Sequence, residues 1–180
     1  MITFVSPTLE YALLAPMLIV LAGALIGVLI EAFAPRSARA SSQLFITLAT
    51  LAISLASLIR VRNSASTTAA MESVTFDGAG MLLQASILVI SIISVFLIAD
   101  TENFTALAAA LPGSDEEREA LKSGNQVTEV YPLTLFAVSG MLLFPIASDL
   151  ITLFVALEML SLPLYLMAGL SRRRRLASQE

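Results

Sequence analysis

The sequence predicts an all-α membrane protein with about five transmembrane helices. Its 180 residues are 57% apolar and 13% charged, whereas soluble domains have about 45–50% apolar and about 25% charged residues. The apolar residues come in five blocks, each near the roughly 20 residues that cross a bilayer. Because hydrocarbon cannot pair with backbone polar groups, these blocks should be helices, and the alternation typical of a membrane β-barrel is not seen. The predicted spans are approximately 11–34, 42–59, 79–99, 130–147 and 150–170.

The composition excludes several classes of chemistry for this chain acting alone. It contains no His and no Cys. Without these residues there is no Ser-His-Asp triad, thiolate nucleophile, disulfide, iron–sulfur cluster or Cys/His zinc site. The net charge of −4 gives no basic surface for nucleic acid. We therefore expect a lipid-embedded chain that binds no metal, cofactor or nucleic acid.

The first three predicted spans are interpreted as uncleaved helices that pack closely against one another. Residues before span 11–34 include Glu10 but no Lys or Arg, and the apolar run is too long for a signal peptide, so an uncleaved helix is favoured. Gly23 and Gly27 have the spacing that allows helices to approach closely. We interpret that spacing as packing, and Gln84 in the third span as an interhelical hydrogen-bonding group.

The connections suggest two parts of the chain, 1–128 and 129–180. The first part holds three helices and an acidic loop at about 100–128, and the second holds the last two helices and a basic end. Within the loop, Ser114 and Glu117 fit a capping box, which predicts a short surface helix near 115–123. Residues 63–68 are predicted to form a polar outer loop.

The distribution of basic residues predicts the orientation in the membrane. Lys and Arg are enriched on the cytoplasmic side of membrane proteins. With the N-terminus outside, eight basic residues lie inside and two, Arg60 and Arg62, lie outside. We therefore place the C-terminus in the cytoplasm. The eight are Arg36, Arg39, Arg118, Lys122 and the run Arg172, Arg173, Arg174 and Arg175.

Glu158 is the charged residue that the topology does not explain. The nearest comparable acid, Glu31, lies close to Arg36 at the cytoplasmic edge, whereas Glu158 falls near the centre of span 150–170. A charge at that depth costs about 2.5–3.5 kcal/mol on insertion scales, and intramembrane acids of this kind commonly move ions or protons. The alternative is a neutral, buried Glu that joins two helices by hydrogen bonds.

The neighbours of Glu158 favour a functional role. Ser161 and Tyr165 lie three and seven positions further along, on the same helix face, and extend a polar path toward the cytoplasm. Pro163 cannot donate its amide, so the carbonyl of Met159 loses its helical partner and a kink is expected. Such a site could carry protons or cations. Asp149 or Ser148 is expected to cap the same helix.

The segment 153–165, LFVALEMLSLPLY, resembles the antiporter-like membrane subunits of bacterial NADH-quinone oxidoreductase (respiratory complex I). The Ser-Leu-Pro-Leu-Tyr that follows Glu158 is closest to the subunit N branch, whereas the sibling branches L and M usually place Trp where this chain has Leu157. Three helices precede the antiporter-like domain in that branch, as they do here. The chain therefore resembles the N-terminal part of a fourteen-helix subunit.

The resemblance implies a non-redox subunit of a proton-translocating enzyme in the bacterial plasma membrane. Glu158 matches the essential proton-translocating carboxyl of the family, whose partner is a Lys on a later helix. NADH, FMN, Fe–S clusters and quinone are handled by other subunits of the complex, which are the implied partners together with the lipid bilayer. The chain's single Lys, Lys122, is in a loop, so we expect an N-terminal fragment or truncated product that is inactive alone.

Two other functions remain as alternatives. One is a subunit of an Mrp-type cation/proton antiporter, which shares the acid of the fifth helix. The absence of Trp before Glu158 and the Ser161–Tyr165 pattern argue against it. The other is a helical scaffold with no transport role.

Overall fold

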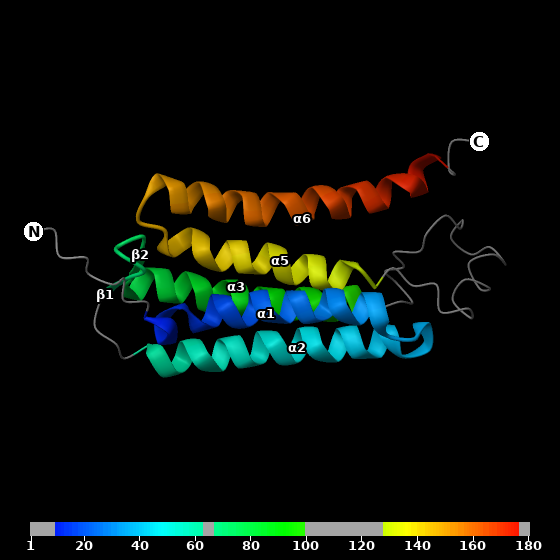
Figure 1. Cartoon of the computed structure of the whole chain (residues 1–180), viewed down its shortest axis with the longest axis horizontal. Coiled ribbons are helices and arrows are strands. Elements are labelled where there is room, and N and C mark those ends of the chain that lie inside the picture. The colour runs from blue at the N-terminus through cyan, green and yellow to red at the C-terminus, as the bar shows by residue number, and fades with distance from the viewer. Residues whose placement is uncertain (1–9, 63–66, 100–127, 177–180) are drawn as a thin grey trace, which may run out of the picture.

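The computed structural model describes residues 10–62, 67–99 and 128–176, and shows a bundle of helices that run side by side (Figure 1). Successive helices run in opposite directions, as expected for a chain that crosses a membrane repeatedly. The helices are α1 (Tyr11–Phe33), α2 (Arg36–Val61), α3 (Gly78–Ala99), α5 (Val130–Leu143) and α6 (Leu150–Leu176), with the 3-10 turn η1 (Phe144–Ile146) after α5 and the short strands β1 (Thr67–Ala69) and β2 (Val74–Phe76) before α3.

The helices confirm the predicted all-α, multi-pass membrane fold. Four of them are long and apolar enough to span a bilayer, and the segment Val130–Ile146 is a shorter apolar helix. Two predicted boundaries were too short. Helix α2 begins at Arg36, directly after Pro35, which is the N-cap residue and has an extended backbone (ψ 143°). Helix α6 continues to Leu176 through the arginine run.

Helices α1 and α2 form a tight antiparallel hairpin. The buried face of α1 carries small residues, including Gly23 and Gly27. A Cβ placed on Gly23 would lie 2.4 Å from the side chain of Thr50 in α2, so only glycine permits this approach. The interpretation of these glycines as packing residues agrees with this intramolecular contact. The face of α2 that packs here is polar and buried, and comprises Gln43, Thr47, Thr50 and Ser54.

Helix α5 lies at the centre of the bundle and packs against α1, α3 and α6. Most of its residues are buried, among them Leu135, Val138 and Leu142. Helix α6 packs along one side of α5 and forms an edge of the bundle (Figure 1). Large apolar side chains are exposed on the outer faces of α2, α3 and α6, where lipid would cover them.

A short antiparallel hairpin, β1 with β2, was not predicted from the sequence. Its turn places three consecutive non-glycine residues at positive φ: Ala70 (52°), Met71 (57°) and Glu72 (67°). Strand β2 makes an additional bridge between Val74 and Ala147, beyond η1. The hairpin therefore ties the α2–α3 connection to the turn between α5 and α6.

Some predictions fall on parts of the chain outside the described residues. These are the surface helix at 115–123, the acidic loop at about 100–127 and residues 63–66 of the predicted polar loop. The division of the chain at 128 and 129 stays a prediction.

Candidate functional site: the α6 carboxylate and the Glu31 cluster

Asp149, one of the two residues predicted as a cap, caps the start of α6. Its Oδ1 accepts hydrogen bonds from the backbone N–H groups of Ile151 and Thr152, both 2.8 Å away, and its Oδ2 accepts one from the Thr152 hydroxyl at 2.8 Å. These bonds, those from Thr152 foremost, lower the pKa of the Asp149 carboxyl. The charged cap is therefore present at neutral pH, and its stabilising effect is lost only as the pH falls through that lowered pKa.

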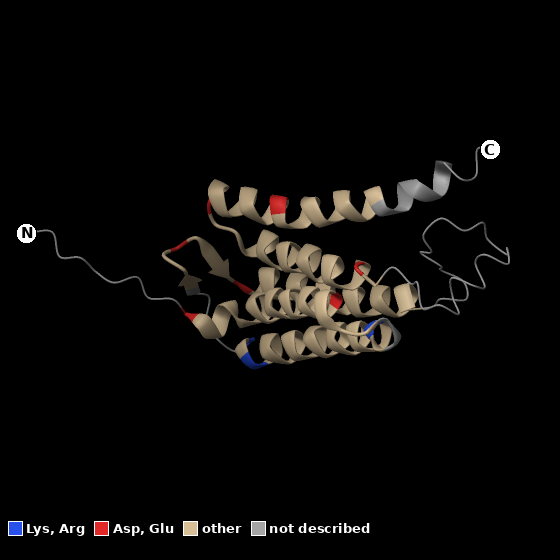
Figure 2. Cartoon of the chain, turned by 45° about the vertical axis from the view of Figure 1, so that its right-hand side comes forward, with Lys and Arg blue, Asp and Glu red and all other residues tan. Residues whose placement is uncertain are grey.

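Glu158 lies eight residues into α6, about 12 Å along the helix from its first residue. Figure 2 shows charged residues mainly near helix ends, with one acidic segment partway along α6. The side chain of Glu158 is exposed, and within the described residues its carboxylate accepts no hydrogen bond. The burial of Glu158 in the whole protein stays a prediction, but among the described residues its carboxyl is not buried. The reason is that α6 is at the edge of the bundle and Glu158 is on a face that no described helix covers.

The other predicted site residues lie on both sides of α6. Tyr165 is 70% exposed, on the open face with Glu158, and Ser161 is half-buried. Pro163 is buried, and α6 runs through it as one continuous helix. A polar path from Glu158 through Ser161 to Tyr165 stays a prediction, as does the functional role of each residue.

The turn of α6 that carries Glu158 packs directly against Gly140 of α5. A Cβ added to Gly140 would lie 2.6 Å from the Leu160 nitrogen, 2.8 Å from the Met159 carbonyl carbon and 2.9 Å from the Ala156 oxygen. All three are backbone atoms, so the two helix backbones touch directly. Gly140 therefore sets how closely the segment Ala156–Leu160 approaches the centre of the bundle.

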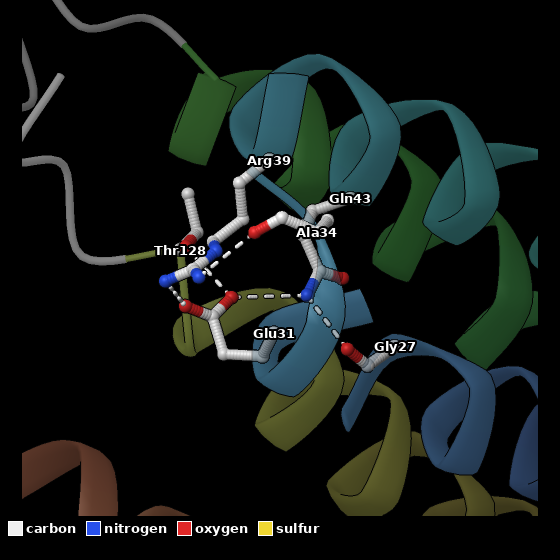
Figure 3. Close-up of polar contacts among 6 residues, drawn as sticks. All are labelled: Gly27, Glu31, Ala34, Arg39, Gln43 and Thr128. Carbon is white, nitrogen blue, oxygen red and sulfur yellow. Dashed lines mark hydrogen bonds and ion pairs between the residues drawn. The ribbon is translucent and has the colours of Figure 1, made fainter. Parts of the chain in front are cut away.

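A second group of polar side chains gathers around Glu31, near the end of α1 (Figure 3). Its Oε1 is 2.9 Å from Arg39 Nη1, and its Oε2 accepts hydrogen bonds from Thr128 Oγ1 (2.7 Å) and Gln43 Nε2 (3.1 Å). Gln43 Nε2 also donates to the Gly27 carbonyl at 2.8 Å. We call Glu31, Arg39, Gln43 and Thr128 the Glu31 cluster. It joins α1, α2 and the residues just before α5.

Glu31 is close to Arg36 in the sequence, but in the structure its ion pair is with Arg39. Residues Ala34 and Pro35 reverse the chain, which brings the first turn of α2 back over the last turn of α1. The carboxylate has three donors, one of which is the cationic Arg39, and these contacts fix its position. Arg39 Nη2 is also held, by the Ala34 carbonyl at 3.0 Å.

Gln84 has the interhelical role that its position in span 79–99 suggested. Its side chain is 1% exposed, and its Nε2 donates to the Leu142 carbonyl at 2.8 Å. That carbonyl belongs to the last turn of α5, where helix carbonyls lack their usual partners. Gln84 therefore caps α5 from the neighbouring helix α3.

Taken together, five packed apolar helices, the last of which carries Glu158 partway along its length, define a helical, multi-pass membrane protein. Over nearly its whole length the chain is similar to curated proteins named NADH-quinone oxidoreductase subunit N. It is 48% identical over 180 residues to that of Acidothermus cellulolyticus, a match that covers 97% of this chain and 35% of the relative. It is 44% identical over 203 residues to that of Rhodococcus opacus, covering 99% of this chain and 37% of the relative.

The same name is carried by a Mycobacterium tuberculosis protein, which is 42% identical over 198 residues, covering 97% of this chain and 37% of the relative. No family model matches the chain. The chain spans about a third of the length of these curated relatives. The resemblance read from residues 153–165 is thus confirmed by similarity along almost the entire sequence.

Proposed function

We propose that this chain is part of a membrane subunit of NADH-quinone oxidoreductase that couples the reaction of the complex to proton translocation. The observation that carries the proposal is Glu158, an acidic side chain within an apolar helix that is similar in sequence to subunit N. Its proposed role is to bind and release a proton during turnover. Ser161 and Tyr165 are proposed to extend its polar path.

The open face of α6 supports this role. A carboxylate that faces hydrocarbon is costly, so the face that bears Glu158 requires a polar or charged partner in the assembled enzyme. A cation close to Glu158 would favour the carboxylate, and its withdrawal would favour the protonated acid. Movement of that cation would therefore drive proton uptake and release at Glu158.

The redox groups are proposed to lie elsewhere in the complex. The sequence of this chain has no Cys or His for an iron–sulfur cluster, and we propose that NADH, FMN, the Fe–S clusters and quinone are bound by other subunits. The proposed partners of this chain are the neighbouring membrane subunits and the lipid bilayer. Its proposed place is the bacterial plasma membrane.

Glu158→Gln in the assembled complex tests the function. Gln keeps the size of Glu but cannot exchange a proton, so we expect proton uptake by membrane vesicles to fall by about tenfold or more. NADH oxidation is followed in parallel, because a coupled enzyme slows when pumping is blocked.

Glu72→Gln is the matched control, because Glu72 is an exposed acid in the turn between β1 and β2. It should leave both rates unchanged. Wild-type proton uptake and NADH oxidation in Glu158→Gln would show that Glu158 is not the proton carrier.

We propose that the start of α1 faces outward and the end of α6 faces the cytoplasm. Even with Arg39 left out because it pairs with Glu31, the sequence has seven basic residues on the proposed inner side and two on the outer side. Topology reporters inserted after Ala65 should appear outside, and those inserted after Gly113 should appear in the cytoplasm. The reverse pattern would contradict the orientation.

A further inference from the structure

Two buried polar side chains on α2 have atoms that the described residues leave without a hydrogen-bond partner. Gln43 and Thr47 are both 0% exposed, and Gln43 Oε1 and Thr47 Oγ1 have no partner. Leaving such groups unpaired is costly in a protein interior, and more so at membrane depth. Some donor or acceptor is therefore required at this place.

The orientation of the Gln43 amide is fixed by its other contacts. Its Nε2 donates to the Gly27 carbonyl and to Glu31 Oε2. Exchanging the amide oxygen and nitrogen would turn the oxygen toward two acceptors and lose both bonds. Gln43 Oε1 thus remains an acceptor without a partner among the described residues.

Thr47 differs from several other hydroxyl residues of the bundle, which bond to their own helix. Ser86, Ser91 and Thr134 each donate to the carbonyl four residues earlier in their own helix, at 2.7–2.9 Å. Thr47 makes no such bond, so its hydroxyl is free to donate and accept elsewhere. It lies one turn beyond Gln43 on the same face of α2.

The packing of α1 against α2 places Gln43 Oε1 in the seam between the two helices, and Thr47 lies on the same face of α2 between two residues that contact α1. On either side of Thr47 along α2, Gln43 meets Gly27 and Thr50 meets Gly23. The two glycines have no side chain that could supply a partner. Water, which both donates and accepts, suits an unpaired amide oxygen and an unpaired hydroxyl one helical turn apart.

We propose that Gln43 and Thr47 hold a buried water molecule in the seam between α1 and α2. This water accepts from Thr47 or donates to it, and donates to Gln43 Oε1. The hydrogen-bonded cluster of Glu31 then continues along α2 as far as Thr47, about 12 Å beyond Arg39. The site is separate from Glu158 and does not depend on the proposed function.

Cryo-electron microscopy of the assembled complex, at a resolution that shows ordered waters, tests the site directly. We expect density at hydrogen-bonding distance, about 2.8 Å, from both Gln43 Oε1 and Thr47 Oγ1. A map that shows buried waters elsewhere in the complex but none here would overturn the proposal.

Thr47→Val gives a second, independent measurement, because Val keeps the shape of Thr and removes its hydroxyl. If water binds, the thermal unfolding midpoint of the protein in detergent should fall by about 2 °C or more, and the fall should disappear in a Gln43→Leu background. If the seam is dry, Thr47→Val removes an unpaired group, so an unchanged or higher midpoint would overturn the proposal.

Thr134→Val is the matched control for this substitution. The Thr134 hydroxyl donates to the Val130 carbonyl of its own helix at 2.7 Å, and it is 3.9 Å from Met167 Sδ of α6. The first bond is local and the second is to a weak sulfur acceptor, so both contribute little to stability. Removal of the hydroxyl should leave the midpoint close to that of the wild type.

Discussion

Gly140→Ala should push α6 away from α5 and lower the stability of the protein. The added methyl would meet backbone atoms of Met159 and Leu160 at 2.8 and 2.6 Å, and backbone atoms cannot rotate out of its way. Overpacking of this kind costs about 1–3 kcal/mol, occasionally more. The measurement is the thermal unfolding midpoint of the purified protein in detergent. Because the turn with Glu158 moves with α6, proton uptake by the assembled complex should fall as well.

Gly169→Ala is the matched control, since Gly169 also lies on α6 and a Cβ there meets nothing within 4 Å. Alanine favours helix more than glycine does, so the control should be neutral or more stable by up to about 1 kcal/mol. Equal midpoints for Gly140→Ala and the wild type would mean that the α5–α6 contact is looser than the structure shows.

Glu31→Leu should destabilise the protein more than removal of both members of its ion pair. The single substitution leaves Arg39, whose side chain is only 25% exposed, without its counter-ion, and it removes the acceptor of Thr128 and Gln43. A fully buried pair would lose about 3–5 kcal/mol, and partial exposure reduces this to about 1–3 kcal/mol. The double variant Glu31→Leu/Arg39→Leu should recover part of the loss, because it leaves no unpaired charge.

The thermal unfolding midpoint in detergent tests this order of stabilities. Glu129→Leu removes an exposed acid just before α5 and should change the stability by no more than about 0.5 kcal/mol. A double variant that is less stable than Glu31→Leu would contradict the ion-pair argument. It would indicate that the aliphatic part of Arg39 contributes more through packing than its charge costs.

The helices were predictable because length and hydropathy alone specify a membrane span. The β1–β2 hairpin was not predictable, since its strands have only three residues each. Its turn also lacks the Asn-Gly or Asp-Gly pair that is typical of tight hairpins. Ala70, Met71 and Glu72 take left-handed backbone conformations that their residue types do not favour. The residues that follow this turn bind the α5–α6 connection, through the Ser148 N–H that donates to the Ser73 carbonyl and the bridge between Val74 and Ala147, and such contacts form only in the folded chain.

The position of Glu158 within an apolar helix was predictable, but the residues that surround it were not. Glu158 stood out as an acid in an apolar helix, yet α6 is apolar all round, so periodicity could not say which face meets the bundle. The Glu31 cluster was missed because Thr128 comes from a segment 97 residues away. Gln43 and Thr47 were missed because they fall at the start of a span whose other residues are mostly apolar.

The buried polar face of α2 constrains how the chain enters the membrane during synthesis. Gln43 and Ser54 find their acceptors on α1, at the carbonyls of Gly27 and Pro16. A nascent α2 released into lipid by itself would leave these groups facing hydrocarbon, where nothing can pair with them. The translocation machinery should therefore retain α1 until α2 has emerged, and release the two helices into the bilayer as a preformed pair.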